Sequence, residues 1–142
     1  MAQRELEHLS EAECLALLAS TTVGRLVYVD DVGPTAVPVN YAVAGRDVII
    51  RVEGGAKQHA MAQPVLTFEV DQIDEVTRSG WSIVLRGTGR EVDMESVASL
   101  LRQMEGRFPT PWAFGVHNVW LRITPATVTG RRLAAERAAS VF

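Results

Sequence analysis

The sequence predicts a mainly β domain, built as an antiparallel sheet or barrel and accompanied by short helices. After "TTVG", β-branched runs alternate with turn residues, and no long helices separate them as parallel βαβ units require. The first connections, "DDVGP" and "AGRD", are short enough to join neighbouring antiparallel strands. A chain of 142 residues is one ordinary domain with a substantial core.

A helix is predicted first, because "LSEAECLALLAS" contains a capping signal. Ser10 can cap the helix, and Glu13, three residues later, can complete a capping box. Cys14, Leu17 and Leu18 then fall on one face, which we expect to be buried. After this helix the sequence predicts six strands, at residues 25–30, 35–43, 47–53, 65–71, 81–91 and 119–129.

The first three of these strands are expected to form a meander. Pro38 cannot donate a ladder hydrogen bond, so the second strand must be an edge or be bulged at that point. The third strand stops at two glycines, and a helix whose first turn holds Lys57 is expected to follow. A further helix is predicted at residues 93–105, where Asp93 is the cap and apolar residues recur at helical spacing.

Composition and charge exclude several classes of function. The formal net charge is −3 and the isoelectric point about 5.6, so the basic footprint of a nucleic-acid or acidic-membrane binder is missing. Cys14 is the only cysteine, so no internal disulfide is expected. The polar N-terminus lacks the apolar run of a signal peptide, and no apolar stretch is long enough to span a bilayer. We therefore expect a cytoplasmic protein.

Side chains that could carry out catalysis by themselves are scarce. The histidines His8, His59 and His117 are scattered, and no H-E-x-x-H motif or paired cysteines indicate a zinc site. Ser82 does not lie in a G-x-S-x-G motif, so a hydrolase is not expected. If the protein is an enzyme, an organic cofactor is expected to supply the difficult step.

One stretch, "RVEGGAKQHAM" at residues 51–61, has the residues of an anion site. The glycine pair permits positive φ and close approach of another group, and free N–H groups at a helix start attract anions. Arg51 at the strand end and Lys57 in the helix add two cations. A phosphate is one candidate ligand, and a solvated turn with a surface lysine is the alternative. The spacing is not that of a P-loop, so nucleotide hydrolysis is not expected.

Two further stretches carry an aromatic residue beside a polar one. In "GWSIVLRG", Trp81 is followed by Ser82, and a core tryptophan beside a surface serine is the alternative to a binding role. In "VWLRI", Trp120 and Arg122 share one face of the strand, and the same alternative applies.

Taken in order, these stretches resemble the pyridoxamine 5′-phosphate oxidase-like flavoproteins with the FMN-binding split-barrel fold. The resemblance covers residues 10–133 and is carried by "VGRLVYVDDVGPTAVPVNYAV", "VIIRVEGGAKQHAM", "LTFEVDQID", "GWSIVLRGTGREV" and "VWLRITPATVTGRRL". Within the family, the sequence is most similar to the short, nitroimidazole-reductase-related group. The resemblance implies a single domain over residues 1–142: a six-stranded antiparallel, Greek-key-like split barrel with an N-terminal helix and one or two further helices. Residues 134–142 are expected to form a frayed helix or a disordered tail.

The resemblance also implies a homodimer that binds FMN at the subunit interface. Carried over to this sequence, it implies that the isoalloxazine ring is lined by Pro38, Val39, Asn40 and Tyr41. The phosphate would be held by Arg51, Gly55, Ala56 and Lys57. The partner subunit would contribute Trp81 and Ser82, and by a looser match Trp120 and Arg122 would lie near the flavin.

The implied function is an FMN-dependent oxidoreductase that acts on a small acceptor such as a nitro or quinone-like compound. One alternative is a reductase that uses the deazaflavin coenzyme F(420), whose longer acidic tail would need further cations, namely Arg25, Arg46, Arg51 and Lys57. Another is a non-catalytic flavin- or haem-binding sensor. Larger oxidases carry additional basic residues near the C-terminus, and only Arg131 and Arg132 stand there in this chain. Vitamin B6 oxidase activity is therefore not expected.

Overall fold

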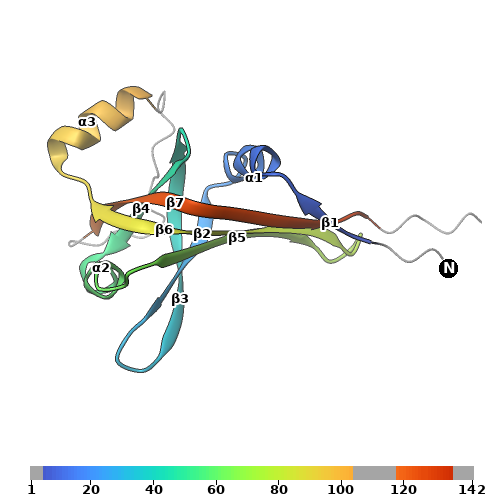
Figure 1. Ribbon diagram of the computed structural model, residues 1–142, viewed down its shortest axis with the longest axis horizontal. Coiled ribbons are helices and arrows are strands. Elements are labelled where there is room, and N and C mark those ends of the chain that lie inside the picture. Colours follow the sequence, from blue (N-terminus) through green and yellow to red (C-terminus); the bar gives the residue numbers. More distant parts are fainter. Residues whose placement is uncertain (1–4, 104–117, 136–142) are drawn as a thin grey trace, which may run out of the picture.

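The computed structural model describes residues 5–103 and 118–135, and their strands form a closed barrel (Figure 1). The strands are β1 (Leu6–Leu9), β2 (Val23–Val29), β3 (Pro34–Ala44), β4 (Asp47–Glu53), β5 (Leu66–Asp74), β6 (Ser79–Glu91) and β7 (Asn118–Leu133). The helices are α1 (Glu11–Leu18), α2 (Gly54–Met61) and α3 (Met94–Gln103). No helix in these ranges is long and apolar enough to cross a membrane.

The barrel closes because β7 pairs with both ends of the remaining sheet. The strand order is β7-β4-β3-β2-β5-β6, every neighbouring pair is antiparallel, and β6 pairs with β7 again. β2, β3 and β4 form the predicted meander, and β5 returns beside β2, which completes a Greek key. The six-stranded barrel is thus confirmed, and β1 is an additional strand on β7 that the sequence did not predict.

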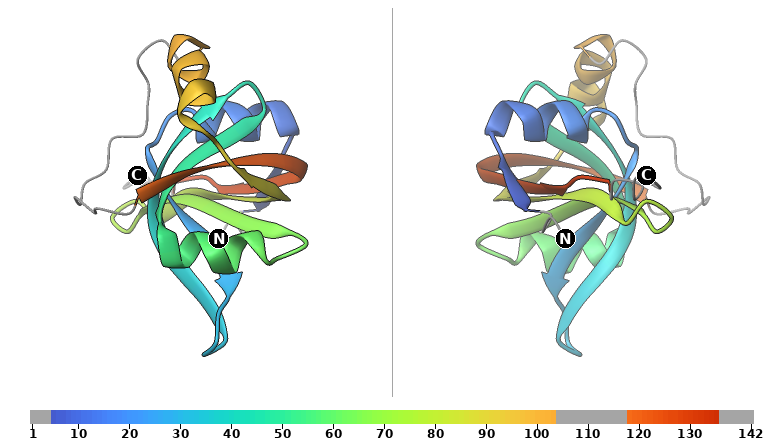
Figure 2. Two further views of the ribbon diagram at one scale, coloured as in Figure 1. Left: turned by 90° about the vertical axis from the view of Figure 1, so that its left-hand side faces the viewer. Right: turned by 90° about the vertical axis from the view of Figure 1, so that its right-hand side faces the viewer.

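The N-terminal helix α1 begins with the predicted capping box. The Glu13 N–H donates to Ser10 Oγ at 3.2 Å, and the Ser10 N–H donates to Glu13 Oε1 at 3.1 Å. Cys14 and Leu18 are fully buried and Leu17 packs against the core, so the predicted buried face is confirmed. Helix α1 therefore covers part of the barrel, as the two views in Figure 2 show.

Strand β3 is a sheet edge where it carries Pro38. It pairs with β2 from Pro34 to Asn40, but with β4 only from Asn40 to Ala44. The register against β2 is continuous, so there is no bulge, and the missing N–H of Pro38 costs no ladder bond to β4. This half of β3 and its partner β2 project beyond the barrel as a hairpin (Figure 1).

Alternate side chains of the strands fill the barrel. Val48 and Ile50 of β4 meet Phe68 of β5 and Ile83 of β6 in the main core. Ile49 points to the outside, yet it is fully buried because Leu100 of α3 covers it in a second, smaller cluster. Helix α3 therefore shields the outer face of β4.

Helix α3 is confirmed over the residues that the structure describes. Asp93 caps it, since the Ser96 N–H donates to Asp93 Oδ1 at 2.7 Å. The last residues of the predicted helix at 93–105, together with His117 and residues 136–142 of the predicted tail, lie outside the described residues.

Candidate functional site

The start of helix α2 lacks the side-chain cap that most helices have. Its N-cap residue is Glu53, which makes no side-chain cap hydrogen bond, and the first turn contains no acidic residue. A Cβ added to Gly55 would meet no atom within 4 Å, so there is free space beside Gly55. The first N–H groups of α2 therefore have no side-chain cap from Glu53, and a ligand can approach the first turn at Gly55.

The glycine pair does not use the positive φ that it permits. Both glycines belong to α2, and the glycines with positive φ among the described residues are Gly33, Gly45 and Gly80. The pair therefore does not form a left-handed turn. The strand passes directly into the helix, and the small side chains leave the first turn accessible.

Arg51 lies on the outside of β4, three residues before α2. In the sheet register it stands between Asn40 of β3 and Trp120 of β7, and its Cζ lies 4.7 Å from the centroid of the Trp120 ring. Its Nε is buried and has no hydrogen-bond partner among the residues that the structure describes. A buried donor without an acceptor costs about 1–3 kcal/mol. The guanidinium is therefore held by the stack on Trp120, while its Nε has no acceptor among the described residues.

Lys57 forms an ion pair that no sequence pattern indicated. Its Nζ lies 2.9 Å from Oε2 of Glu91, and both side chains are partly exposed. Glu91 ends β6, where the Val92 N–H donates to the Trp120 carbonyl at 2.9 Å. The two residues are far apart in sequence, and only the barrel closure brings them together. We call Arg51, residues 53–57, Glu91 and Trp120 the anion corner.

The four residues expected to line a flavin ring divide between two faces of β3. Val39 and Tyr41 point into the barrel core, whereas Asn40 stands beside Arg51 on the outside. The Tyr41 hydroxyl donates to the Leu18 carbonyl at 2.6 Å and lies 2.5 Å from Thr21 Oγ1. Burial raises the pKa of this phenol. Val39 and Tyr41 can therefore meet a ligand outside the barrel only through their backbone.

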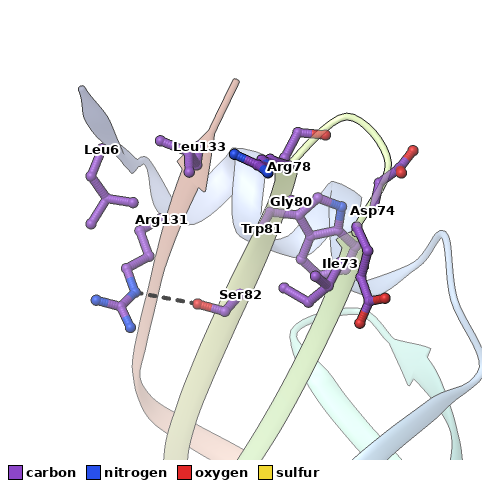
Figure 3. A pocket seen from close by; sticks show the side chains of 11 residues that line it. Leu6, Ile73, Asp74, Arg78, Gly80, Trp81, Ser82, Arg131 and Leu133 are labelled. Atoms are coloured by element: carbon purple, nitrogen blue, oxygen red, sulfur yellow. Dashed lines mark hydrogen bonds between the residues drawn. The ribbon is translucent and has the colours of Figure 1, made fainter. Parts of the chain in front are cut away.

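Trp81 and Ser82 lie in a different part of the chain, in a groove of about 510 Å³ (Figure 3). We call it the end groove. It is lined by Leu6, Ile73, Asp74, Glu75, Arg78, Ser79, Gly80, Trp81, Ser82, Arg131 and Leu133. Arg131 Nε donates to Ser82 Oγ at 3.4 Å, and the side chain of Ile73 is largely exposed. The groove thus combines an apolar floor with two guanidinium groups, two serine hydroxyls and two carboxylates.

The anion corner and the end groove lie at opposite ends of the molecule. In Figure 1, α2 marks one end and β1, which contributes Leu6 to the groove, marks the other. One copy of the chain therefore does not bring Trp81 and Ser82 together with Arg51 and Lys57.

The remaining candidate cations already have carboxylate partners. Arg122 Nε lies 2.5 Å from Asp47 Oδ2 and borders a second cavity of about 400 Å³ between α3 and the end of β6. Arg46 pairs with Glu11 of α1. Arg25 lies 2.9 Å from Asp71 and 3.4 Å from Glu69. Arg25 and Arg46 thus have carboxylate partners of their own, and their side chains are about half exposed.

Comparisons with known proteins agree with this architecture. The family model described as pyridoxamine 5′-phosphate oxidase matches residues 10–132. The uncharacterized protein Rv0080 of Mycobacterium tuberculosis is 35% identical over 140 residues, which cover 94% of this chain and 89% of that protein.

Two solved structures are similar over nearly their whole length. A candidate pyridoxamine 5′-phosphate oxidase from Corynebacterium glutamicum has a TM-score of 0.76 at 26% identity and covers 97% of this chain and 99% of its own. The FAD binding protein of Mycobacterium smegmatis has a TM-score of 0.66 at 29% identity, with 92% and 100% covered. By the extent of the family match and by these relatives, the chain belongs to the pyridoxamine 5′-phosphate oxidase-like family.

Proposed function

We propose that the protein is a flavin-dependent oxidoreductase that binds FMN at the anion corner and passes electrons or hydride to a small acceptor of the nitro or quinone type. The observation that carries this proposal is the buried Nε of Arg51, which has no acceptor in the part of the chain that the structure describes and lies beside the open start of α2. A phosphate monoester brings three acceptor oxygens and a charge of about −1.5 to −2.

The anion corner has the chemistry that a phosphate needs. The guanidinium of Arg51 offers planar donors, Lys57 offers a compact positive charge, and the first turn of α2 offers backbone N–H groups. Trp120 fixes the orientation of Arg51 by stacking under it. A ligand phosphate would therefore meet donors that are already arranged before it arrives.

The complete site is proposed to form between two copies of the chain. The end groove, with Trp81 and Ser82, lies too far from the anion corner to serve the same ligand within one chain. A partner subunit would bring its own end groove to the flavin ring, where an indole can cover apolar ring surface and a hydroxyl can hydrogen-bond to a polar edge.

In this proposal the bound flavin supplies the redox chemistry, accepting electrons from a donor and giving them to the acceptor. The residues of the chain bind and orient it. Arg51 and Lys57 hold the phosphate, and Asn40, on the same outer row as Arg51, presents a side-chain amide on the outer face of β3. The similarity to the FAD binding protein of Mycobacterium smegmatis supports a flavin in this role.

The decisive experiment is the absorbance spectrum of the purified protein with and without added FMN. We expect a yellow complex that is bleached by a nicotinamide donor or dithionite. Lys57→Ala should weaken FMN binding by about 1.5–3 kcal/mol, the scale of a charge-assisted hydrogen bond, and should leave the melting temperature nearly unchanged because Lys57 is partly exposed. Protein that takes up no FMN would refute the proposal, and FMN binding without turnover would instead favour a sensor.

A further inference from the structure

The anion corner contains a carboxylate that works against the binding of a doubly charged phosphate. We propose that Glu91 is a specificity-determining residue: by pairing with Lys57 it lowers the affinity for a phosphate monoester and favours a phosphate that carries a single charge. This inference rests on the proposed function, because it concerns the same phosphate site. It adds a residue that neither the sequence pattern nor the family match points to.

The contact that carries the inference is the ion pair between α2 and the end of β6. Lys57 Nζ lies 2.9 Å from Glu91 Oε2, so the ammonium already has an anionic partner. The Glu91 side chain is about half exposed, at 48%, and the Lys57 side chain is 28% exposed. Such a pair is weak enough for a ligand to compete with it. A phosphate that reaches Lys57 must either displace the carboxylate or stay within a few ångströms of it.

The charges of the corner show why the ligand charge matters. Arg51 and Lys57 contribute two positive charges. Glu91 offsets the charge of Lys57 through the ion pair, whereas the charge of the exposed Glu53 is screened by solvent. A monoester carries a charge of about −1.5 to −2, which exceeds the single positive charge that remains while Glu91 is paired with Lys57. A phosphodiester group carries about one negative charge and matches the remaining positive charge. The Nε of Arg51, which has no hydrogen-bond partner in the described part of the chain, does not distinguish between the two ligands.

Glu53 provides a matched comparison within the same corner. It is exposed, it precedes α2 directly, and it makes no side-chain bond to the helix start. Glu53→Gln removes the same charge as Glu91→Gln without breaking the ion pair to Lys57. The two variants therefore separate the effect of the pair from the effect of total charge.

The experiment measures the dissociation constants of FMN, riboflavin 4′,5′-cyclic phosphate and riboflavin by flavin fluorescence for the wild type, Glu91→Gln and Glu53→Gln. FMN carries a doubly charged monoester, the cyclic phosphate is a singly charged diester of the same flavin, and riboflavin has no phosphate. We expect Glu91→Gln to tighten FMN binding about fivefold, to change binding of the cyclic phosphate less than about twofold and to leave riboflavin unchanged. Glu53→Gln should change the ratio of the FMN and cyclic phosphate affinities less than about twofold.

The inference is overturned if Glu91→Gln leaves the ratio of the FMN and cyclic phosphate affinities unchanged, if it weakens FMN binding, or if Glu53→Gln has the same effect. If the wild type takes up none of the three flavins, the proposed function fails. The inference is then decided with inorganic phosphate and dimethyl phosphate, whose binding is followed by the shift in melting temperature. It stands if Glu91→Gln strengthens the effect of inorganic phosphate alone, and it falls if neither ion gains.

Discussion

The substitution Arg51→Lys tests the anion corner most directly, because it keeps the positive charge and removes the planar fork. Lysine cannot reproduce the buried Nε or the stack on Trp120, in which Cζ lies 4.7 Å from the ring centroid. If a phosphate accepts from Arg51, the variant loses at least one charge-assisted hydrogen bond, worth about 1.5–3 kcal/mol. The FMN dissociation constant should therefore rise about tenfold to a hundredfold.

The free protein should not lose stability in this variant. The lost cation–π contact costs about 0.5–1 kcal/mol. Removing a buried donor that has no acceptor among the described residues returns about 1–3 kcal/mol. The free energy of unfolding should therefore be unchanged or higher by up to about 2.5 kcal/mol, and urea unfolding without flavin measures it.

The assay is fluorescence titration with FMN and riboflavin, and the control is Arg46→Lys, because Arg46 is paired with Glu11 on another part of the surface. The effect should be confined to FMN, since riboflavin has no phosphate. Equal weakening of both ligands would mean that Arg51 acts on the ring or on the fold. FMN binding at the wild-type level would refute the assignment of Arg51 to the phosphate.

Two further predictions concern stability. Burial, with the neighbouring carboxyl of Asp71, raises the pKa of Glu69 from 4.5 to about 7, so the folded state holds this proton more tightly than the unfolded chain does. The free energy of unfolding should therefore fall as the pH rises from about 4.5 to about 7. Glu69→Gln should remove this fall and be more stable than the wild type by about 1 kcal/mol near pH 8. If urea unfolding gives the wild type and the variant the same pH profile, Arg25 neutralises the Glu69 carboxylate in the folded protein. Tyr41→Phe removes the hydroxyl that donates to the Leu18 carbonyl and should lower the free energy of unfolding by about 1–3 kcal/mol. The control is Tyr28→Phe, which keeps the ring that stacks on His59 and should lower it by less than about 0.5 kcal/mol. Equal costs for the two tyrosines would contradict the role of the Tyr41 hydroxyl.

The strands of the barrel could be predicted because burial imposes a period of two on their side chains. In β4, Val48 and Ile50 face the core and Arg51 faces outward, as alternation predicts. Strand β1 could not be predicted, since "LEHL" is short and polar. It becomes a strand only because the end of β7 offers it a partner. A pairing between residues so far apart in the chain cannot be predicted from the local sequence.

The candidate site was predictable only in part. Arg51 and the start of α2 are close in sequence, so their proximity followed from local structure. Alternation along a strand also predicts that the adjacent residues Asn40 and Tyr41 point to opposite faces of β3, so their side chains cannot both line one ligand. The ion pair of Lys57 with Glu91 depends on how the barrel closes, which no local pattern encodes.

Strand β7 joins three other strands, and this has a consequence for biosynthesis. It pairs with β4 near its start, with β6 along most of its length and with β1 at its end. A ribosome makes it after the other six strands. Until it emerges, β4 and β6 are two open edges on which foreign chains can add, and the longest-range contacts cannot form. The nascent polypeptide is therefore most prone to aggregation immediately before β7 leaves the ribosome. Deletions that shorten β7 should lower the yield of soluble protein more than truncation of any loop.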